Sequence, residues 1–280
     1  MERKFIKIWV ISLLLLGGCA KPKIYDKSKI VALSETKSFN DNGTLRTELI
    51  KQTARGIGAQ AALAWQAYHV NETLEKHRRK LDHIFNFNYL ILEHNVLPPI
   101  LMEGKNILNL ADDFSLRIAD REYQIIQPPR FVTAAPHWRG YIWMPYEAPE
   151  KPSSALLPRN KCERNLWNEY IEIGWNDGIE QANQIFDSNL AKLKRDYLGM
   201  ILYRKLLAQN MVTSPYVSKT DLGITGSGDD MHINDRVLRI TSTSYLRTNA
   251  KQWRPAATTQ GKEKSKLFNT EQVKTLMDKI

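Results

Sequence analysis

Apolar residues recur at helical spacing in two long stretches of the chain. In the first stretch they lie three, four or eight positions apart: Leu45, Leu49, Ile57, Ala61, Ala64 and Tyr68. This spacing places them on one face of a helix, which we predict over residues 44–81. Glycine and alanine are frequent in its middle, so the backbone of another helix could approach closely. That partner is either a helix of the same chain or a helix of another protein.

The second stretch covers residues 160–209 and begins with Asn160 and Glu163, which resemble an N-terminal capping box. Its apolar and small residues again fall on one stripe: Trp167, Ile171, Gly174, Gly178, Ala182, Leu190, Leu193 and Tyr197. A helix continuous over this stretch would be about 75 Å long. Because that exceeds the usual globular range, the pattern predicts a break or kink near residues 196–199.

Shorter runs favour β-strands. Residues 114–118 and 123–126 indicate a hairpin joined by residues 119–122, and residues 231–233 and 237–243 indicate two strands around an Asn234-Asp235 turn. The predicted fold class is α+β: a helix-rich single globular domain over residues 44–247 with small antiparallel β hairpins. A polar, lysine-rich C-terminal tail is predicted over residues 248–280, with a terminal helix from residue 270.

The N-terminus has the order of a secretory signal. Arg3 and Lys4 precede an apolar run over residues 5–16, and Gly17-Gly18-Cys19 follow. The small residues before the cysteine resemble the lipobox of bacterial lipoproteins, which predicts a signal peptide over residues 1–18 and lipid attachment at Cys19. An ordinary signal peptide or a short membrane anchor is the alternative. Residues 19–43 are polar and predict a flexible lipidated tether, although residues 30–33 could dock onto the folded body.

The distribution of charge argues against nucleic acid as a partner, and the number of cysteines argues against a disulfide within the chain. The formal net charge is +10, but lysines and arginines are spread along the chain and are not interleaved with aromatic residues, which argues against direct nucleic-acid binding. The chain has two cysteines. With Cys19 acylated, Cys162 has no partner for an intramolecular disulfide, and we expect its thiol to be buried.

No motif of known chemistry stands out. The glycines at 223, 226 and 228 are followed by Asp229-Asp230 rather than by a lysine and a hydroxyl residue, so they predict a structural turn and not a phosphate loop. The six histidines show no metal-ligand spacing, and no serine or cysteine lies in a nucleophile pattern. We therefore expect no catalytic residues, no cofactor and no metal.

One proline-punctuated segment is unusually aromatic, containing Phe131, His137, Trp138, Tyr141, Trp143 and Tyr146. Large aromatic side chains on such a connection either cap the core or anchor another protein. As the sharper hypothesis, we predict that Trp138, Tyr141 and Trp143 form a partner-binding surface.

A set of short landmarks spread over residues 44–247 resembles a known family. The landmarks are Gly58-Ala59-Gln60, Trp138-Arg139, Leu157-Pro158, Gly174-Trp175, Gln181-Ala182, Asn189-Leu190, Arg195-Asp196, Gly199-Met200, Met211-Val212 and Ile233-Asn234-Asp235. They resemble the DotC family, the lipoproteins of type IVB (Dot/Icm) secretion systems, which are similar to the TraI lipoprotein of I-type conjugative plasmids.

The resemblance implies a non-enzymatic lipoprotein on the periplasmic face of the outer membrane of a Gram-negative bacterium. It implies DotD-like and DotH-like partners, with DotG-like and DotF-like components completing an envelope-spanning channel, and several copies in a ring-shaped assembly. The only chemically specified position that carries over is the acylated cysteine, matched by Cys19. The alternatives are a lipid-anchored periplasmic enzyme or binding protein acting on cell wall or solute, and a structural lipoprotein unrelated to secretion.

Overall fold

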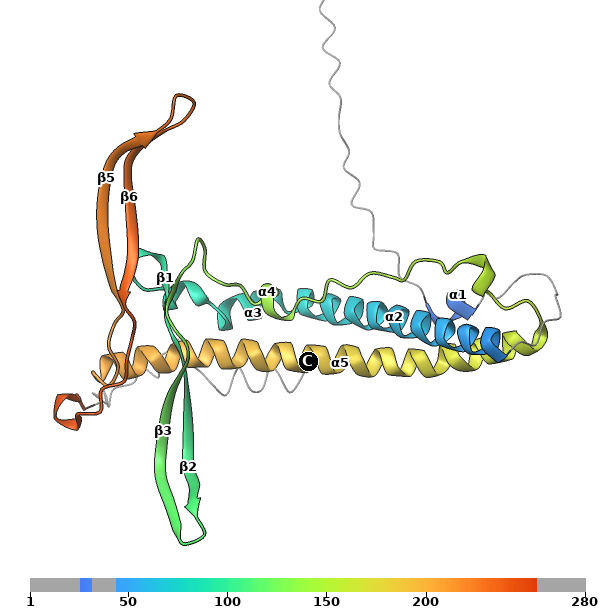
Figure 1. Cartoon of the computed structure of the whole chain (residues 1–280), viewed down its shortest axis with the longest axis horizontal. Coiled ribbons are helices and arrows are strands. Elements are labelled where there is room, and N and C mark those ends of the chain that lie inside the picture. Colours follow the sequence, from blue (N-terminus) through green and yellow to red (C-terminus); the bar gives the residue numbers. More distant parts are fainter. Residues whose placement is uncertain (1–25, 32–43, 256–280) are drawn as a thin grey trace, which may run out of the picture. The chain divides into compact units, whose positions relative to one another are not determined.

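The computed structural model describes residues 26–31 and 44–255 (Figure 1). These residues form a helix-rich α+β structure with antiparallel two-stranded sheets, which confirms the predicted fold class. They cluster into two compact units. The first takes in the described residues up to Trp65 together with Tyr146–Asn176. The second takes in Gln66–Pro145 and the described residues from Asp177 onward. The predicted signal peptide, most of the tether and the predicted terminal helix lie outside the described residues.

The first predicted helix is two helices, α2 (Thr44–Lys76) and α3 (Arg78–Ile84), separated at His77. The ring of His77 lies 2.9 Å from the carbonyl oxygen of Thr73, and its backbone N–H donates to the same carbonyl. The predicted end near residue 81 was therefore close, but the pattern gave no sign of the interruption.

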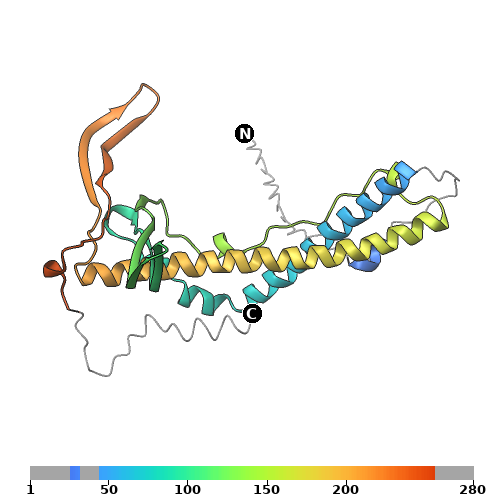
Figure 2. The ribbon, with the colours of Figure 1, turned by 60° about the horizontal axis from the view of Figure 1, so that its bottom comes forward.

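Helix α5 (Lys161–Ala208) has 48 residues and no break, so the predicted kink near residues 196–199 was wrong. Figure 1 and Figure 2 both show it as one continuous helix. Gly199 serves close packing instead, because a Cβ built there would lie 2.6 Å from the backbone oxygen of Leu101. Asn160 caps the start by accepting the Glu163 N–H at 2.8 Å. The helix ends in a Schellman arrangement, with Asn210 at positive φ and the Met211 N–H donating to Leu206 at 2.9 Å.

In the first unit, α2 and α5 approach to backbone contact at two glycines. A Cβ on Gly58 would lie 2.6 Å from the carbonyl oxygen of Ile171, and one on Gly174 would lie 2.1 Å from the carbonyl oxygen of Arg55. The apolar side chains around this contact form one buried cluster: Ile30, Ile50, Ala54, Ile57, Ala61, Trp167 and Ile171. Gly58 and Gly174 of the sequence pattern therefore serve packing within this chain.

Helix α1 (Lys27–Val31) packs against the same cluster. Ile30 is 1% exposed, and the Lys27 ammonium lies 3.0 Å from the Glu172 carboxylate. Docking of this segment was an open alternative in the sequence, and Ile30 takes that role. The segment predicted as a tether is thus held to the first unit by its residues 27–31.

An ion pair with a buried carboxylate links α2 to the start of α5 in this unit. Arg46 on α2 donates to both carboxylate oxygens of Glu163, at 2.9 and 3.2 Å, and the Arg159 N–H donates to the same carboxylate at 2.7 Å. Burial would raise the pKa of Glu163, but these donors outweigh it and hold the pKa below its usual value. Cys162, beside it, is exposed, so the expectation of a buried thiol was wrong. It lies on the outward side of the first turn, whereas Glu163 turns inward to Arg46.

The second unit contains two long hairpins, drawn as two-stranded ribbons in Figure 1. Strands β2 (Ile100–Asp112) and β3 (Ser115–Gln127) pair antiparallel. The hairpin predicted around residues 119–122 was wrong, because residues 115–118 and 123–126 of its two proposed strands all belong to β3. The actual turn lies at Asp113 and Phe114, where the Phe114 N–H donates to Asp112 at 2.8 Å.

Strands β5 (Tyr216–Gly226) and β6 (Met231–Ser242) form the other hairpin. The predicted turn at Asn234 was wrong: Asn234 has a φ of 58° inside β6, where it distorts the strand without reversing it. The reversal occurs at residues 227–230, with the Ser227 N–H donating to Asp230 at 2.9 Å. A Cβ on Gly226 would lie 2.2 Å from the Asp230 carbonyl oxygen. The glycine cluster is thus a structural turn.

Shorter elements complete the second unit. Strand β1 (Val96–Leu97) pairs with β4 (Arg130–Phe131), and helix α4 (Arg139–Ile142) follows β4 in the chain. The unit also contains three short 3-10 helices: Phe87–Leu90, Glu93–Asn95 and Ala250–Gln252. A fourth 3-10 helix, Ser154–Leu156, belongs to the first unit. A buried cluster of Leu101, Tyr203, Leu206 and Val212 holds the stem of β2 against α5. The chain remains attached beyond residue 247, since the Arg254 N–H donates to Gln209 at 2.8 Å.

The glycine contact between α2 and α5 predicts a sharp contrast between two substitutions. Gly174→Ala should lower the free energy of unfolding by about 1–3 kcal/mol, because backbone atoms must move to admit the Cβ. Gly56→Ala, where a Cβ meets nothing within 4 Å, should raise it by about 0.5–1 kcal/mol through helix propensity. Urea unfolding followed by circular dichroism measures both. Equal effects at the two positions would contradict the packing described.

Candidate partner-binding surface

The four site residues predicted from the sequence, Cys19, Trp138, Tyr141 and Trp143, differ in whether the structure describes them and in how exposed they are. Cys19 lies outside the described residues. Trp138, Tyr141 and Trp143 all lie in or beside α4 in the second unit, so the structure brings these three together on one short segment. Their exposure differs, however, and exposure decides which side chain a partner could reach.

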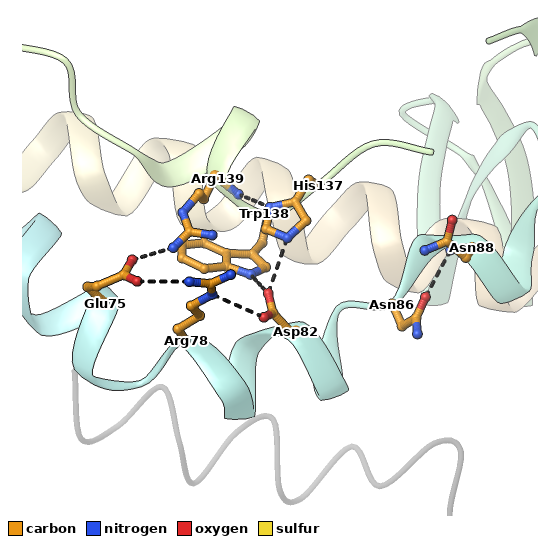
Figure 3. Close-up of polar contacts among 8 residues, drawn as sticks. All are labelled: Glu75, Arg78, Asp82, Asn86, Asn88, His137, Trp138 and Arg139. Carbon is orange, nitrogen blue, oxygen red and sulfur yellow. Dashed lines mark hydrogen bonds and ion pairs between the residues drawn. The ribbon is translucent and has the colours of Figure 1, made fainter. Parts of the chain in front are cut away.

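Trp138 belongs to the core. Its side chain is fully buried, and its indole N–H donates to the Asp82 carboxylate at 2.7 Å (Figure 3). The ring of His137 contacts the same carboxylate oxygen at 3.1 Å. The Arg139 guanidinium lies 4.7 Å from the centre of the Trp138 ring, within the range of a cation–π contact. The aromatic segment is thereby fastened to α3.

Ion pairs add further contacts between the aromatic segment and helices α2 and α3 (Figure 3). Arg139 forms a short ion pair with Glu75 at the end of α2, Arg78 lies 3.4 Å from the same carboxylate, and the Nε of Arg78 lies 3.7 Å from Asp82. The indole hydrogen bond, with help from His137, holds the pKa of Asp82 below its usual value against the opposing effect of burial. Asp82 therefore stays ionised at neutral pH and serves as an acceptor.

Tyr141 is half-buried and stacked. Its ring lies parallel to that of Phe87, with centroids 5.8 Å apart, and Phe87 in turn meets Tyr197 edge-on at 5.1 Å. Burial, together with the nearby Asp196 carboxylate, raises the pKa of Tyr141 to about 12. The phenol is neutral at physiological pH, and its ring is occupied by contacts within the second unit.

Trp143 is the member of the set with an accessible ring. Its residue is 38% exposed, and the Arg139 guanidinium lies 5.8 Å from its ring centre. Tryptophan and arginine are both enriched at protein–protein hot spots. Partner contact at Trp138, Tyr141 and Trp143 stays a prediction, and the structure offers Trp143 as the side chain that such contact would use first.

Three other features bear on binding and location. Within residues 26–31 and 44–255, no group of three or more His, Cys, Asp or Glu side chains could hold a metal ion. In the same residues, no helix has the length and apolar character to cross a bilayer. A hollow of about 440 Å³ lies beside Gln66, His69, Asn183 and Phe186 in the second unit. The Gln66 and Asn183 amides at its edge hydrogen-bond each other at 2.9 Å, so those groups are already partnered.

Residues 44–255 match the protein family described as type IV secretory system, conjugal DNA-protein transfer, the TraI family. The match covers well over half of the chain, and nearly all of the described residues.

This chain belongs to the TraI family.

Membership confirms the resemblance found in the sequence, which pointed to the DotC and TraI proteins. No curated protein sequence matches the chain. As a TraI-family protein, the chain is a component of a type IV secretion system. It follows that its partners include other components of that machinery.

Sequence reasoning missed two features of this second unit. The Asp82–Trp138 contact joins residues 56 positions apart, and nothing in the local pattern of either residue signals it. The exposed apolar residues near the β2–β3 turn had a signal, since Leu108 and Leu110, like Leu116 and Ile118, alternate with polar residues. The prediction placed Leu116 and Ile118 in a strand of the wrong hairpin and assigned Leu108 and Leu110 to no strand.

The indole–carboxylate bond predicts a pH-dependent contribution to stability. Trp138→Phe removes the donor. In addition to the packing loss, this should lower the free energy of unfolding at about pH 7 by about 1 kcal/mol. That figure is the contribution of a hydrogen bond to a charged group, reduced because Asp82 is partly exposed. Because the folded-state pKa of Asp82 is lowered, this part is present above the carboxyl's ordinary pKa and is lost as pH falls below about 4.

Urea unfolding at a series of pH values measures the difference. Trp143→Phe is the matched control, and it should change stability by less than about 0.5 kcal/mol at every pH. A Trp138→Phe deficit that stays constant down to about pH 3 would show that packing alone, without the carboxylate, sets the effect.

Proposed function

We propose that this protein is a non-enzymatic, lipid-anchored outer-membrane component of a type IV secretion core complex. Its role is to recruit and position DotH-like and DotD-like partners, so that DotG-like and DotF-like components complete the channel for export of DNA or effector proteins. The observation that carries the proposal is the family match over residues 44–255. The lipobox-like sequence Leu16-Gly17-Gly18-Cys19 supports the anchor.

Lipid attachment suits an assembly role on physical grounds. One acyl chain holds a protein on a bilayer only marginally, whereas two or more give stable attachment. Anchored proteins are confined to a surface, which raises their effective concentration for one another. Interfaces of modest affinity then suffice to build a multi-component complex.

The docked helix α1 limits how far the folded body stands from the membrane. Ile30 is buried in the first unit, and Lys27 is paired with Glu172. Eight residue steps separate Cys19 from Lys27. Fully extended, they reach at most about 27 Å. The anchor would therefore hold the first unit near the membrane surface, where recruitment to the outer membrane requires it.

Replacement of the acylated thiol tests the anchor. Cys19→Ser should abolish labelling by radioactive palmitate, release the protein from the outer-membrane fraction, and reduce conjugal transfer or effector export to background, because the acyl chains cannot attach. Cys162→Ser is the matched control, since Cys162 is exposed and the chain has two cysteines. Normal outer-membrane fractionation of Cys19→Ser would contradict the proposed anchor.

Photo-crosslinking tests the aromatic segment. A photoreactive amino acid at position 143 should give adducts with another secretion component in assembled envelopes, because the Trp143 ring is accessible. The same group at position 138 should give far fewer, since Trp138 is fully buried. Adduct formation at neither position would remove this segment from the partner-binding surface.

A further inference from the structure

The β2–β3 hairpin exposes a group of large apolar side chains near its turn. Four consecutive residue pairs are regular there, from Ile107 opposite Ala119 to Leu110 opposite Leu116. Directly opposed residues share a face, and so do residues two apart on one strand. Four side chains therefore lie on one face, each between 54% and 71% exposed: Leu108, Leu110, Leu116 and Ile118. Exposed apolar patches of this kind mark interaction sites in soluble proteins.

Every charged side chain on this face or at the turn is a carboxylate. Asp120 and Glu122 follow Ile118 at spacings of two along β3, and the register is the same on both sides of Asp120, so they share its face. Asp112 and Asp113 lie at the turn. The other four charged side chains of the hairpin lie on the opposite face: Glu103, Lys105, Arg117 and Arg121. The apolar face is thus bounded by negative charge towards both its turn and its stem.

The C-terminal segment of the chain carries an apolar stripe of matching size. Residues 270–280 lie outside the described residues, and their sequence predicts a helix. Successive residues of a helix are about 100° apart around its axis. Four large apolar residues therefore fall together on one side of the predicted helix: Val273, Leu276, Met277 and Ile280.

Lysines border this stripe on both sides. On the same projection Lys274 and Lys279 lie roughly 110° to either side of the centre of the stripe, whereas Glu271 and Asp278 fall on the far side of the helix. Residues 262–266, just before it, add three lysines and one glutamate. An apolar stripe bordered by lysines complements an apolar face bordered by carboxylates.

The segment is long enough to reach this face. The hairpin lies in the same unit as the described residues up to Pro255. The stem of β2 packs against the C-terminal end of α5, where the Arg254 N–H donates to Gln209. The strand carries the apolar face about 30 Å from that stem. Residues 255–273 span up to about 60 Å when fully extended.

Other pairings fit less well. The four carboxylates would repel an anionic lipid surface from this face. The β5–β6 hairpin is a poorer host for the helix, because Asn234 has a positive φ and register shifts flank Gly223. A segment of the same chain also has a high effective concentration at the face, so a contact of modest area suffices.

We propose that residues 270–280 form an amphipathic helix that packs on the apolar face of the β2–β3 hairpin of the same chain. Lys274 and Lys279 then lie next to the carboxylates that border this face. Any partner that binds the face must first displace the segment. This contact is a property of the folded chain and depends neither on the lipid anchor nor on other secretion components.

Crosslinking within one chain tests the proposal in cells that make the full-length protein without other secretion components. Cys19→Ser and Cys162→Ser remove both native cysteines. Leu110→Cys then places one thiol on the apolar face, and Gln272→Cys places another beside the apolar stripe. A short bifunctional maleimide should join the two, giving a product of monomer size whose linked peptides are identified by mass spectrometry. The predicted helix is about 16 Å long, so either direction of packing keeps the two thiols close.

Matched variants make the test specific to the two faces. Asn109→Cys, in place of Leu110→Cys, puts the thiol on the opposite face of the same strand and should give several-fold less product. Met277→Asp, added to the first pair, should reduce the product at least tenfold, because it puts a charge into the apolar contact. Thr275→Asp, on the far side of the predicted helix, should leave the product unchanged.

Labelling with a monofunctional maleimide confirms that both thiols react. Product of dimer size only, equal yields from positions 109 and 110, or no product from reactive thiols would each overturn the proposal.

Discussion

The contact of α2 and α5 at two glycines is the constraint on which the first unit is built. At Gly58 and Gly174 the two helices touch through backbone atoms, and no other residue has room there. This approach brings the apolar side chains of both helices into one buried cluster, into which Ile30 of α1 also packs. The ion pair of Arg46 and Glu163 then sits at the edge of that cluster, where three donors keep the carboxylate charged.

In the second unit, a polar contact rather than close helix packing holds the chain in place. Its aromatic segment is tied down by one carboxylate, Asp82, which accepts from the Trp138 indole while arginines neutralise the charges around it. With the segment fixed, Tyr141 stacks inward and Trp143 remains at the surface. The hairpins depart from this pattern: the stem of β2–β3 is buried against α5, but both hairpins expose large apolar side chains near their turns. Exposed apolar side chains of this kind suit a component that buries them by assembly.

The outcome of the sequence predictions follows from the range of the interactions involved. Helical periodicity, capping at Asn160 and the fold class depend on neighbours within a few positions, and they were predicted correctly. The break expected near Gly199 was wrong because that glycine allows close contact with the backbone of Leu101, almost a hundred positions away in the sequence. The hairpin turns were misplaced because Asn234 and residues 119–122 look like turn sequences, whereas pairing along whole strands decides where each chain reverses. At the predicted surface, local composition pointed to the aromatic segment, but only the fold separates buried Trp138 from exposed Trp143.

We propose that this TraI-family protein acts as an anchored assembly component. Purification of detergent-solubilised envelope complexes through a tag on the full-length protein, followed by identification of the co-purifying proteins, tests it most directly. We expect recovery from the outer-membrane fraction in a large complex with several other secretion proteins in fixed proportion. Recovery of the protein alone, or with cell-wall enzymes or transporter subunits in place of secretion components, would contradict it.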